Sequence, residues 1–318
     1  MNSTGYKALR EQAAWGDFNG RGKIKLTGKD RARLLHAMTT NHIRQLTPGS
    51  GVYAFFLNVQ GRILGDANIF CMPDYFLLDT EPETAEKLYQ HLKKFIIADD
   101  VTPEDLTPTL STIAVEGPKS REVLLSVGAP VPEADLAIAL WETCSVARAS
   151  LTGEPGFLLF LPIEAKSDLI QRLESAGAVA ADAEAFRIVR LEHGKPRYGH
   201  DITERNLAQE TQQMQAVHFQ KGCYLGQEIV ERVRSRGHVN RVLMPLHLET
   251  TEPPQPGTKL TVDNQPAAEI SSSVYSPALD KVVGLGYVRV EFAKPGTRLA
   301  WDSVPAEVQT MEIHAPAG

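Results

Sequence analysis

The amino-acid sequence predicts an α+β protein that ends in a small all-β domain. Strand-like and helix-like segments alternate irregularly through the first 240 residues, whereas short β-rich runs separated by turn residues follow Arg241. The chain of 318 residues also exceeds the usual span of one hydrophobic core, which favours two or three domains. We therefore expect an α+β region over residues 1–240 and a separate β domain over residues 241–318.

The first part of the α+β region has the pattern of a strand, a helix and a group of strands. In GKIKLTGKDRARLLHAMTTN, a short strand precedes a helix for which Asp30 can serve as N-cap. Two β-rich runs, GVYAFFLN and RILGDANIF, flank a short segment with Gly61 at a turn position, which predicts a hairpin. The run YFLLDT supplies a third strand.

The second part of the α+β region predicts further helices and a second hairpin. Apolar residues recur at helical spacing in ETAEKLYQHLKKF. The run STIAVEG predicts a strand that leads into a helix with Pro118 near its start. The segment TCSVARASLTGEPGFLLFL predicts a hairpin, and helices are expected over residues 163–176 and 183–193.

The β-rich runs after Arg241 are RVLMPLHL, TKLTV, AAEISSSVY and KVVGLGYVRV. They are separated by the turn-forming segments PPQPG, DNQP and SPALD. Short strands at this spacing predict a small antiparallel barrel or sandwich.

Composition excludes several classes of partner. A net charge of −6 argues against general binding to nucleic acid or to acidic membranes. The N-terminal segment has no apolar signal-peptide core, and no apolar run approaches the roughly 18 residues of a membrane span. We expect a cytoplasmic protein that binds neither nucleic acid nor membrane directly.

The three cysteines do not predict a disulfide framework or a metal site. Cys71, Cys144 and Cys223 lie more than 70 residues apart and have no Cys/His ligand spacing. Cys71 and Cys144 lie in strand-like runs, which favours structural burial. Cys223 does not lie in a strand-like run of this kind, so the same argument for burial does not apply to it.

Glu192 is the first candidate functional residue. It falls on the apolar face of the predicted helix with Ile188 and Val189. An unpaired carboxylate in that position would be costly, so Glu192 should bind an arginine, backbone amides or a polar ligand. The structural alternative is an ion pair, for instance with Arg187 or Arg190.

The long polar segment over residues 194–220 is the second candidate. Segments of this length inside a compact domain are usually functional or disordered. It is rich in hydrogen-bonding groups, and Phe219 could pin its end into a core. These groups are Tyr198, Asp201, Gln209 and Glu210. A flexible surface loop is the alternative.

The run KGCYLGQEIVERVRSRGHVNR is the third candidate. Leu225, Ile229 and Val233 recur every four residues, which predicts a helix that begins near residues 222–226 and places Cys223 at its start. The positive end of the helix and a neighbouring lysine would favour a thiolate there. A buried thiol beneath a solvated helix is the alternative. Arginines outnumber acidic residues in this segment, namely Arg232, Arg234, Arg236 and Arg241 against Glu228 and Glu231.

The strings KGCYLGQE, RLEHGKPRYGHD, NLAQE and LTGKDRARLLHAMTTN together resemble the YgfZ-type folate-binding protein family. That family is related to T-protein, the aminomethyltransferase of the glycine cleavage system. The resemblance covers nearly the whole chain and implies a three-domain, T-protein-like arrangement around a central folate-binding opening, with the barrel covering one side. The implied cofactor is tetrahydrofolate or a one-carbon derivative.

The resemblance also implies roles for individual residues. Glu192 matches the glutamate that hydrogen-bonds the pterin in T-protein relatives, and Asp66 and Asp79 lie near folate-contacting positions. Tyr198 and Arg232 complete the expected folate contacts, the arginine through the glutamyl tail. Lys221 and Cys223 are expected to form the reactive pair of the opening.

The sequence departs from T-protein enzymes at Gly65. An Asp-Asp pair stands in those enzymes where this chain has Gly65-Asp66, so one carboxylate is missing. Loss of a carboxylate from a reacting site commonly weakens it by orders of magnitude. Ala208 stands where the family usually has proline.

The resemblance therefore favours a folate-binding accessory protein that supports iron–sulfur cluster assembly or repair, with an indirect link to tRNA modification. Its expected partners are folate and iron–sulfur assembly proteins or client enzymes. A single cysteine cannot hold a cluster alone. A glycine-cleavage aminomethyltransferase and a non-catalytic interaction module are the alternatives.

Overall fold

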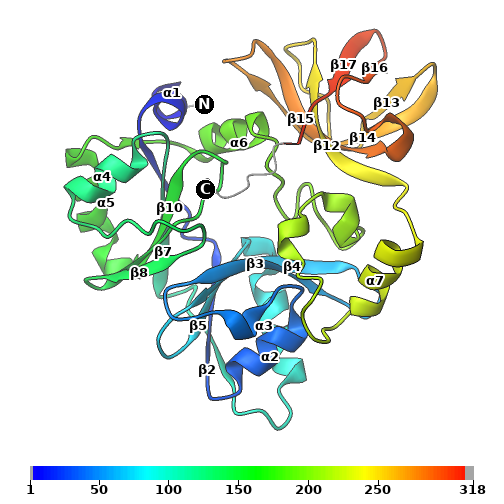
Figure 1. The fold of residues 1–318 in the computed structure, drawn as a ribbon. Coiled ribbons are helices and arrows are strands. Elements are labelled where there is room, and N and C mark those ends of the chain that lie inside the picture. Colours follow the sequence, from blue (N-terminus) through cyan, green and yellow to red (C-terminus); the bar gives the residue numbers. More distant parts are fainter. Residues whose placement is uncertain (1–2, 312–318) are drawn as a thin grey trace.

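The computed structural model describes residues 3–311, in which the chain builds two open sheets and one closed barrel (Figure 1). Residues 312–318 of the expected β domain lie outside the described residues. Helix α6 (Ala183–Glu192) lies between the six-stranded sheet and the barrel, and the five-stranded sheet lies across from it (Figure 1). The predicted α+β class with a C-terminal barrel is confirmed.

The five-stranded sheet has the order β3–β4–β5–β2–β6. Its apolar face packs on two helices through residues such as Ile24, Ile69, Leu35 and Leu88. The predicted hairpin and third strand are confirmed, and Gly61 turns the hairpin with a φ of 69°. The elements are β2 (Gly22–Thr27), α2 (Arg31–Met38), β3 (Gly51–Leu57), β4 (Ile63–Cys71), β5 (Phe76–Thr80), α3 (Ala85–Phe95) and β6 (Thr102–Asp105).

The N-cap predicted for α2 is only partly right. Asp30 occupies the N-cap position, but its side chain makes no capping bond to the helix. Its Oδ2 accepts instead from the backbone N–H of Asp100 at 2.9 Å. The carboxylate therefore ties the start of α2 to the segment before β6.

The six-stranded sheet has the order β11–β1–β7–β10–β9–β8. The chain enters it through β1, leaves to form the five-stranded sheet, and returns at β7. The predicted second hairpin is confirmed as the antiparallel pair of β9 and β10. The elements are β1 (Ala14–Asp17), β7 (Leu110–Glu116), α4 (Ser120–Ser126), β8 (Ile138–Trp141), β9 (Cys144–Ala147), β10 (Gly156–Pro162), α5 (Lys166–Ser175) and β11 (Val179–Ala180).

One helix was absent from the sequence prediction. Helix α1 (Ser3–Glu11) packs on α6 and buries Tyr6 and Leu9 in the core that the two sheets share with the barrel. The helix is short and most of its side chains are polar, so its sequence signal is weak. Buried contacts therefore stabilise it more than its own propensity does.

The barrel closes in the order β12–β15–β14–β13–β16–β17, with antiparallel pairing throughout. Alternating apolar residues such as Leu246, Leu260 and Val282 fill its interior. The sequence predicts either a barrel or a sandwich, and the closed strand order shows that this domain is a barrel. Its strands are β12 (Arg241–Leu248), β13 (Lys259–Val262), β14 (Gln265–Ser276), β15 (Lys281–Arg289), β16 (Arg298–Trp301) and β17 (Val304–Val308).

The helix expected to begin near residues 222–226 begins directly after that range, with Gly226 as its N-cap. Helix α7 spans Gln227–Arg236, so Cys223 lies in the preceding loop and is exposed. Gly226 has a φ of 82°, and a Cβ there would lie 2.5 Å from the carbonyl oxygen of Asn58. The N-cap of α7 therefore lies in close contact with the β3–β4 turn. Within the described part of the chain, no helix is long and apolar enough to cross a membrane.

Candidate functional site

A cavity of about 920 Å³ opens between the two sheets. Its walls come from β3, β4 and β5, from the loop that joins β9 to β10, and from α6 with the segment that follows it. This volume suits a small organic ligand. No described barrel residue lines the cavity.

Asp66 provides the most perturbed carboxyl group of the cavity wall. Pairing of β3 with β4 places it near Tyr53, whose Oη donates to Asp66 Oδ2 at 2.6 Å. Burial, reinforced by the negative charge of Glu81, raises the pKa of Asp66 from 3.8 to about 7. Among the described residues, none donates a hydrogen bond to its Oδ1. Asp66 can therefore exchange a proton with a ligand near neutral pH.

The glycine beside Asp66 does not face the cavity. A Cβ at Gly65 would lie 3.1 Å from a methyl group of Leu88 on α3. Neighbouring strand residues point to opposite faces, so a carboxylate at this position would enter the apolar core. The departure from the Asp-Asp pair therefore removes no carboxylate from this cavity.

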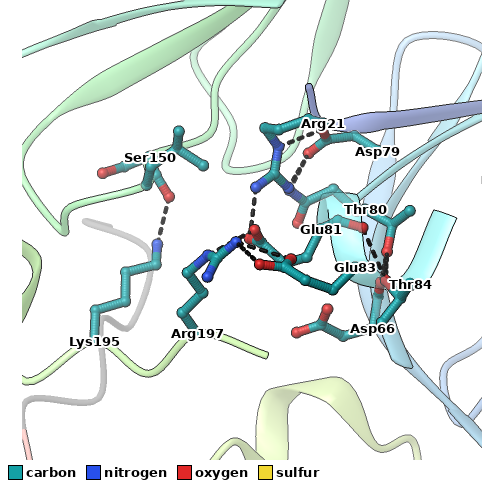
Figure 2. Close-up of polar contacts among 12 residues, drawn as sticks. Arg21, Asp66, Asp79, Thr80, Glu81, Glu83, Thr84, Ser150, Lys195 and Arg197 are labelled. Carbon is teal, nitrogen blue, oxygen red and sulfur yellow. Dashed lines mark hydrogen bonds and ion pairs between the residues drawn. The ribbon is translucent and has the colours of Figure 1, made fainter. Parts of the chain in front are cut away.

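Asp79 is buried in an ion-pair chain on the same wall. Arg21 binds Asp79 in a bidentate manner, with Nε–Oδ1 at 2.7 Å and Nη2–Oδ2 at 2.9 Å. Arg21 Nη1 also donates to Glu81 at 2.5 Å, and Glu81 accepts from Arg197 Nε at 2.8 Å. Figure 2 shows this chain continuing to Glu83. Asp79 lines the cavity, but its oxygens are already bonded to Arg21 and to Asn68.

The cavity lining also contains apolar side chains. Phe18 and Phe186 form an edge-on pair with ring centroids 4.9 Å apart, and Leu136 and Leu151 line the same cavity. Lys195 adds a cation whose Nζ donates to the carbonyl of Ser150 at 2.5 Å (Figure 2). The cavity lining thus combines carboxylates, aromatic rings and a lysine.

The long segment after α6 is ordered by buried contacts and is not a flexible surface loop. Tyr198 lines the cavity and donates to the carbonyl of Ile63 on β4 at 3.0 Å. Burial raises the pKa of its phenol well above the ordinary range. Phe219 packs at the edge of an apolar cluster, as predicted.

Asp201 is the centre of a second buried network. Its Oδ2 accepts from Arg190 Nη1 at 2.7 Å and from the backbone N–H of Arg197 at 3.0 Å. Its Oδ1 accepts from Ser271 Oγ at 2.8 Å and from the hydroxyl of Ser272. These partners belong to α6, to the cavity segment and to β14 of the barrel.

The structure does not bring Glu192 to the cavity. Its carboxylate accepts from Tyr6 Oη and Ser276 Oγ, each at 2.5 Å, and pairs with Arg10. The ion-pair interpretation is therefore right, but the arginine comes from α1 and is neither Arg187 nor Arg190. The predicted contact with a pterin therefore has no support from the cavity, because α1 and the barrel pack against that face of α6.

Lys221 likewise has structural partners. Its Nζ donates to the carbonyls of His36, Thr39 and Asn41 at 2.6–2.7 Å, which matches the three donors of an ammonium group. Burial and the charge of Arg44 lower its pKa to about 7. Lys221 holds the C-terminal end of α2 and does not line the cavity.

Cys223 and Arg232 also lie outside the cavity. Cys223 is exposed, whereas Cys71 and Cys144 are buried as predicted. Arg232 is exposed on α7 and pairs with Glu228 at 2.7 Å. Of the predicted site residues, the cavity unites Asp66, Asp79 and Tyr198 and leaves out Glu192, Lys221, Cys223 and Arg232.

Sequence reasoning missed several cavity residues. Tyr53 lies in β3, and Glu81 and Lys195 lie in the irregular segments after β5 and α6, where no spacing rule distinguishes them from surface residues. Arg21 directly precedes β2, and only the structure shows that β2 pairs with β5, the strand that carries Asp79. Their convergence is a tertiary property.

Two known protein-family descriptions match this chain. The family described as GCVT N-terminal domain matches residues 3–221, and the glycine cleavage T-protein C-terminal barrel domain matches residues 241–314. The chain belongs to the glycine cleavage T-protein family. Membership of the T-protein family confirms the broader part of the predicted resemblance, and the second match coincides with the closed barrel.

Individual T-protein relatives cover most of the chain. The aminomethyltransferase of Chlorobium chlorochromatii is 31% identical over 309 residues, 91% of this chain and 82% of that protein. The aminomethyltransferase of Rubrobacter xylanophilus is 30% identical over 294 residues, 90% of this chain and 78% of that protein. A chloroplastic protein of Arabidopsis thaliana is 26% identical over 284 residues, and the chain spans 87% of its own length and 65% of that protein's length.

A solved T-protein structure shows the same fold. The glycine cleavage system aminomethyltransferase T of Bartonella henselae superposes with a TM-score of 0.89 at 22% identity, covering 97% of this chain and 88% of that one. The likeness establishes a T-protein-like fold for the whole described chain.

Proposed function

We propose that this T-protein family chain binds tetrahydrofolate or a one-carbon derivative in the cavity between its two sheets. The observation that carries the proposal is Asp66, a buried carboxyl group with a pKa of about 7, whose Oδ1 accepts no hydrogen bond from the described residues and which lines the same cavity as Phe18 and Phe186. A reduced pterin offers ring N–H donors to such a carboxyl and an apolar surface to Phe18 and Phe186. Family membership supports this choice of ligand.

Calorimetric titration with tetrahydrofolate tests the proposal. We expect the unaltered chain to bind, and Asp66→Asn to weaken the affinity by roughly 10-fold or more, because a charge-assisted hydrogen bond is lost. Asp168→Asn, a matched change at an exposed position on α5, should leave the affinity unchanged. Equal binding by all three proteins would remove Asp66 from the site.

The finer part of the proposal is an accessory role in iron–sulfur cluster assembly or repair. It is supported by the resemblance of KGCYLGQE to YgfZ-type proteins and by the exposed thiol of Cys223. Within residues 3–311, no cluster of three or more His, Cys, Asp or Glu side chains is placed to hold a metal. Cys223 would therefore act together with an assembly protein or a client enzyme.

Cellular complementation tests the accessory role. In cells that lack the protein, the unaltered chain should restore iron–sulfur enzyme activity, and Cys223→Ser should fail to restore it. Ser235→Ala, a change at an exposed position on α7, serves as the control. If Cys223→Ser fully restored iron–sulfur enzyme activity, the thiol would have no role in the accessory function.

Aminomethyl transfer is a second candidate function. Relatives named as aminomethyltransferases match about nine-tenths of the chain at up to 31% identity. A side chain at position 65 would point toward Leu88 in the core. The cavity has therefore not lost a carboxylate at this position. Turnover of an aminomethyl-loaded lipoyl carrier protein, abolished by Asp66→Asn, would establish this activity, and absence of turnover despite tetrahydrofolate binding would exclude it.

A further inference from the structure

Lys195 differs from the other cations around the cavity in how its donors are used. Among the described residues, its Nζ has one hydrogen-bond acceptor, the carbonyl of Ser150 at 2.5 Å, and no carboxylate lies within ion-pair distance. An ammonium group has three donors, so two are free for a ligand. Lys221, by contrast, has carbonyl acceptors for all three of its donors.

Most other cations of the cavity wall are already neutralised. Arg21, Arg190 and Arg197 each bind a buried or partly buried carboxylate, and Arg187 pairs with Glu184. Arg148 has no carboxylate partner among the described residues, and it donates to a backbone carbonyl at the exposed rim. Lys195 is thus the half-buried cation that retains charge for a ligand.

A buried carboxylate fixes the loop against which Lys195 is held. Glu116, the last residue of β7, is fully buried and accepts hydrogen bonds only from the β9–β10 loop in the described structure. Its donors are the Ser150 hydroxyl, the Leu151 N–H and the N–H and hydroxyl of Thr152. Ser150 and Leu151 line the cavity, so Glu116 sets the shape of this wall.

Glu116 also acts on Lys195 through its charge. Burial lowers the pKa of Lys195, whereas Glu116 and Asp135 oppose that effect and Arg21 and Arg190 add to it. The carboxylate of Glu116 therefore helps Lys195 to stay protonated. The same residue thus sets both the position of the Ser150 carbonyl and the charge of the amine.

We propose that Lys195 binds a carboxylate of the ligand in the cavity and that Glu116 is the positioning residue that holds and charges it. The inference rests on the proposed folate function and names the chemistry on the wall opposite Asp66 (Figure 2). In tetrahydrofolate, the carboxylates belong to the glutamate moiety. Two free donors on a partly desolvated ammonium suit a carboxylate because charge-assisted hydrogen bonds are the strong ones.

Paired titrations with tetrahydrofolate and with tetrahydropteroate, which lacks the glutamate, test the role of Lys195. Lys195→Met should weaken tetrahydrofolate binding by roughly 10- to 100-fold and leave tetrahydropteroate binding within about twofold. Lys281→Met, which removes a lysine from the barrel surface, is the matched control.

The outcomes separate this inference from the function on which it rests. Equal loss for both ligands would show that Lys195 only packs the wall and would overturn the inference, as would unchanged binding of tetrahydrofolate. If the unaltered chain bound neither ligand, the proposed function would fail and the inference with it.

The pH profile tests Glu116. Tetrahydrofolate affinity should fall as pH rises through the pKa of Lys195, and Glu116→Gln should move that fall to lower pH because a stabilising negative charge is lost. Thr152→Val weakens the loop without changing charge, so it should lower the affinity for tetrahydrofolate and leave the pH profile in place.

Two results would contradict the positioning role of Glu116. One is an unshifted profile in a folded Glu116→Gln protein, which would make the residue merely structural. If that variant does not fold, Thr152→Val decides, because unchanged tetrahydrofolate affinity in it would show that the loop does not position Lys195.

Discussion

The carboxyl group of Asp66 lies in an environment that opposes its ionisation. It is buried beside Glu81 and Asp79, and the hydrogen bond from Tyr53 offsets only part of that cost. At the scale of single residues, such a group is a functional feature that reduces stability. Burial and the neighbouring carboxylates bring the pKa of Asp66 close to neutral pH. For the same reason, the ionised carboxylate of Asp66 destabilises the folded state.

The stability of Asp66→Asn should therefore depend on pH in a defined direction. Because the folded-state pKa of Asp66 is raised to about 7, the unfolded chain ionises first, and this group destabilises the protein increasingly from about pH 4 to pH 7. Asparagine mimics the protonated form. We expect Asp66→Asn to raise the free energy of unfolding by roughly 2–4 kcal/mol at pH 8 and by little at pH 4.

Urea denaturation at the two pH values measures this difference. A variant that is no more stable than the unaltered chain at pH 8 would show that Asp66 is ionised at little cost. Asp168→Asn on α5 again provides the exposed comparison.

At the residue scale, the carboxylate of Glu192 is expected to stabilise the folded state, whereas that of Asp66 destabilises it. Its carboxylate satisfies Arg10, Tyr6 and Ser276, while the side chain of Arg10 stays about one-third exposed. Glu192→Gln should lower the free energy of unfolding by about 1–3 kcal/mol, because the arginine loses its charged partner. Tetrahydrofolate affinity should stay within about twofold, since the residue does not line the cavity.

Chemical denaturation of the Glu192→Gln protein measures its free energy of unfolding, and titration with tetrahydrofolate measures its affinity for the ligand. A loss of affinity of 10-fold or more without a loss of stability would restore the pterin contact that the resemblance implied.

At the scale of elements, the C-terminal end of α2 shows how a helix end is satisfied from a distant segment. The last carbonyls of a helix have no intrahelical partner, and here Lys221 donates to those of His36 and Thr39 and also to that of Asn41. The loop that carries Cys223 is thereby fastened to α2. All three donors of the lysine in the K-G-C sequence are used by backbone carbonyls.

Lys221→Met should leave three carbonyls without their donor and lower the free energy of unfolding by roughly 2–4 kcal/mol. Lys119→Met, at an exposed position where the amine bonds the side chain of Gln12, should cost little. Urea denaturation compares the two variants. Unaltered stability combined with failed complementation in cells would instead favour the catalytic role predicted for Lys221.

At the scale of the whole molecule, Asp201 joins the barrel to the cavity. One oxygen binds Arg190 of α6 and the backbone of Arg197, and the other binds two serines of β14. The hydroxyl of Tyr287 on β15 also donates to the Asp201 carbonyl at 2.9 Å. The barrel does not line the cavity, but it holds the segment that does.

Asp201→Asn should therefore loosen the barrel and the cavity segment together. Loss of the charge opposite Arg190 should lower the free energy of unfolding by roughly 2–4 kcal/mol. Hydrogen exchange should become faster both in β14 and in residues 195–202. Faster exchange confined to one of the two regions would show that Asp201 does not couple them.

Local patterns in the sequence were sufficient for much of the fold. Period-two apolar runs and turn glycines predict the β3–β4 hairpin with Gly61 at its turn, and short runs between turn residues predict the barrel strands. These signals are local because strand alternation and turn chemistry depend on neighbouring residues. Helix α1 escaped prediction because its burial comes from α6, far along the chain.

The sequence by itself determined the fold class, the hairpins, the burial of Cys71 and Cys144, and a family resemblance that family comparison confirms at the level of T-protein. Only the tertiary structure decided which polar residues meet. Glu192 and Lys221 have the right chemistry for a site but are bonded to distant elements, while Tyr53 and Lys195 reach the cavity without any sequence signal. The physical reason is that a side chain's partners depend on how separate segments pack, and for Glu192 with Tyr6 and Lys221 with His36 these segments lie more than 180 residues apart.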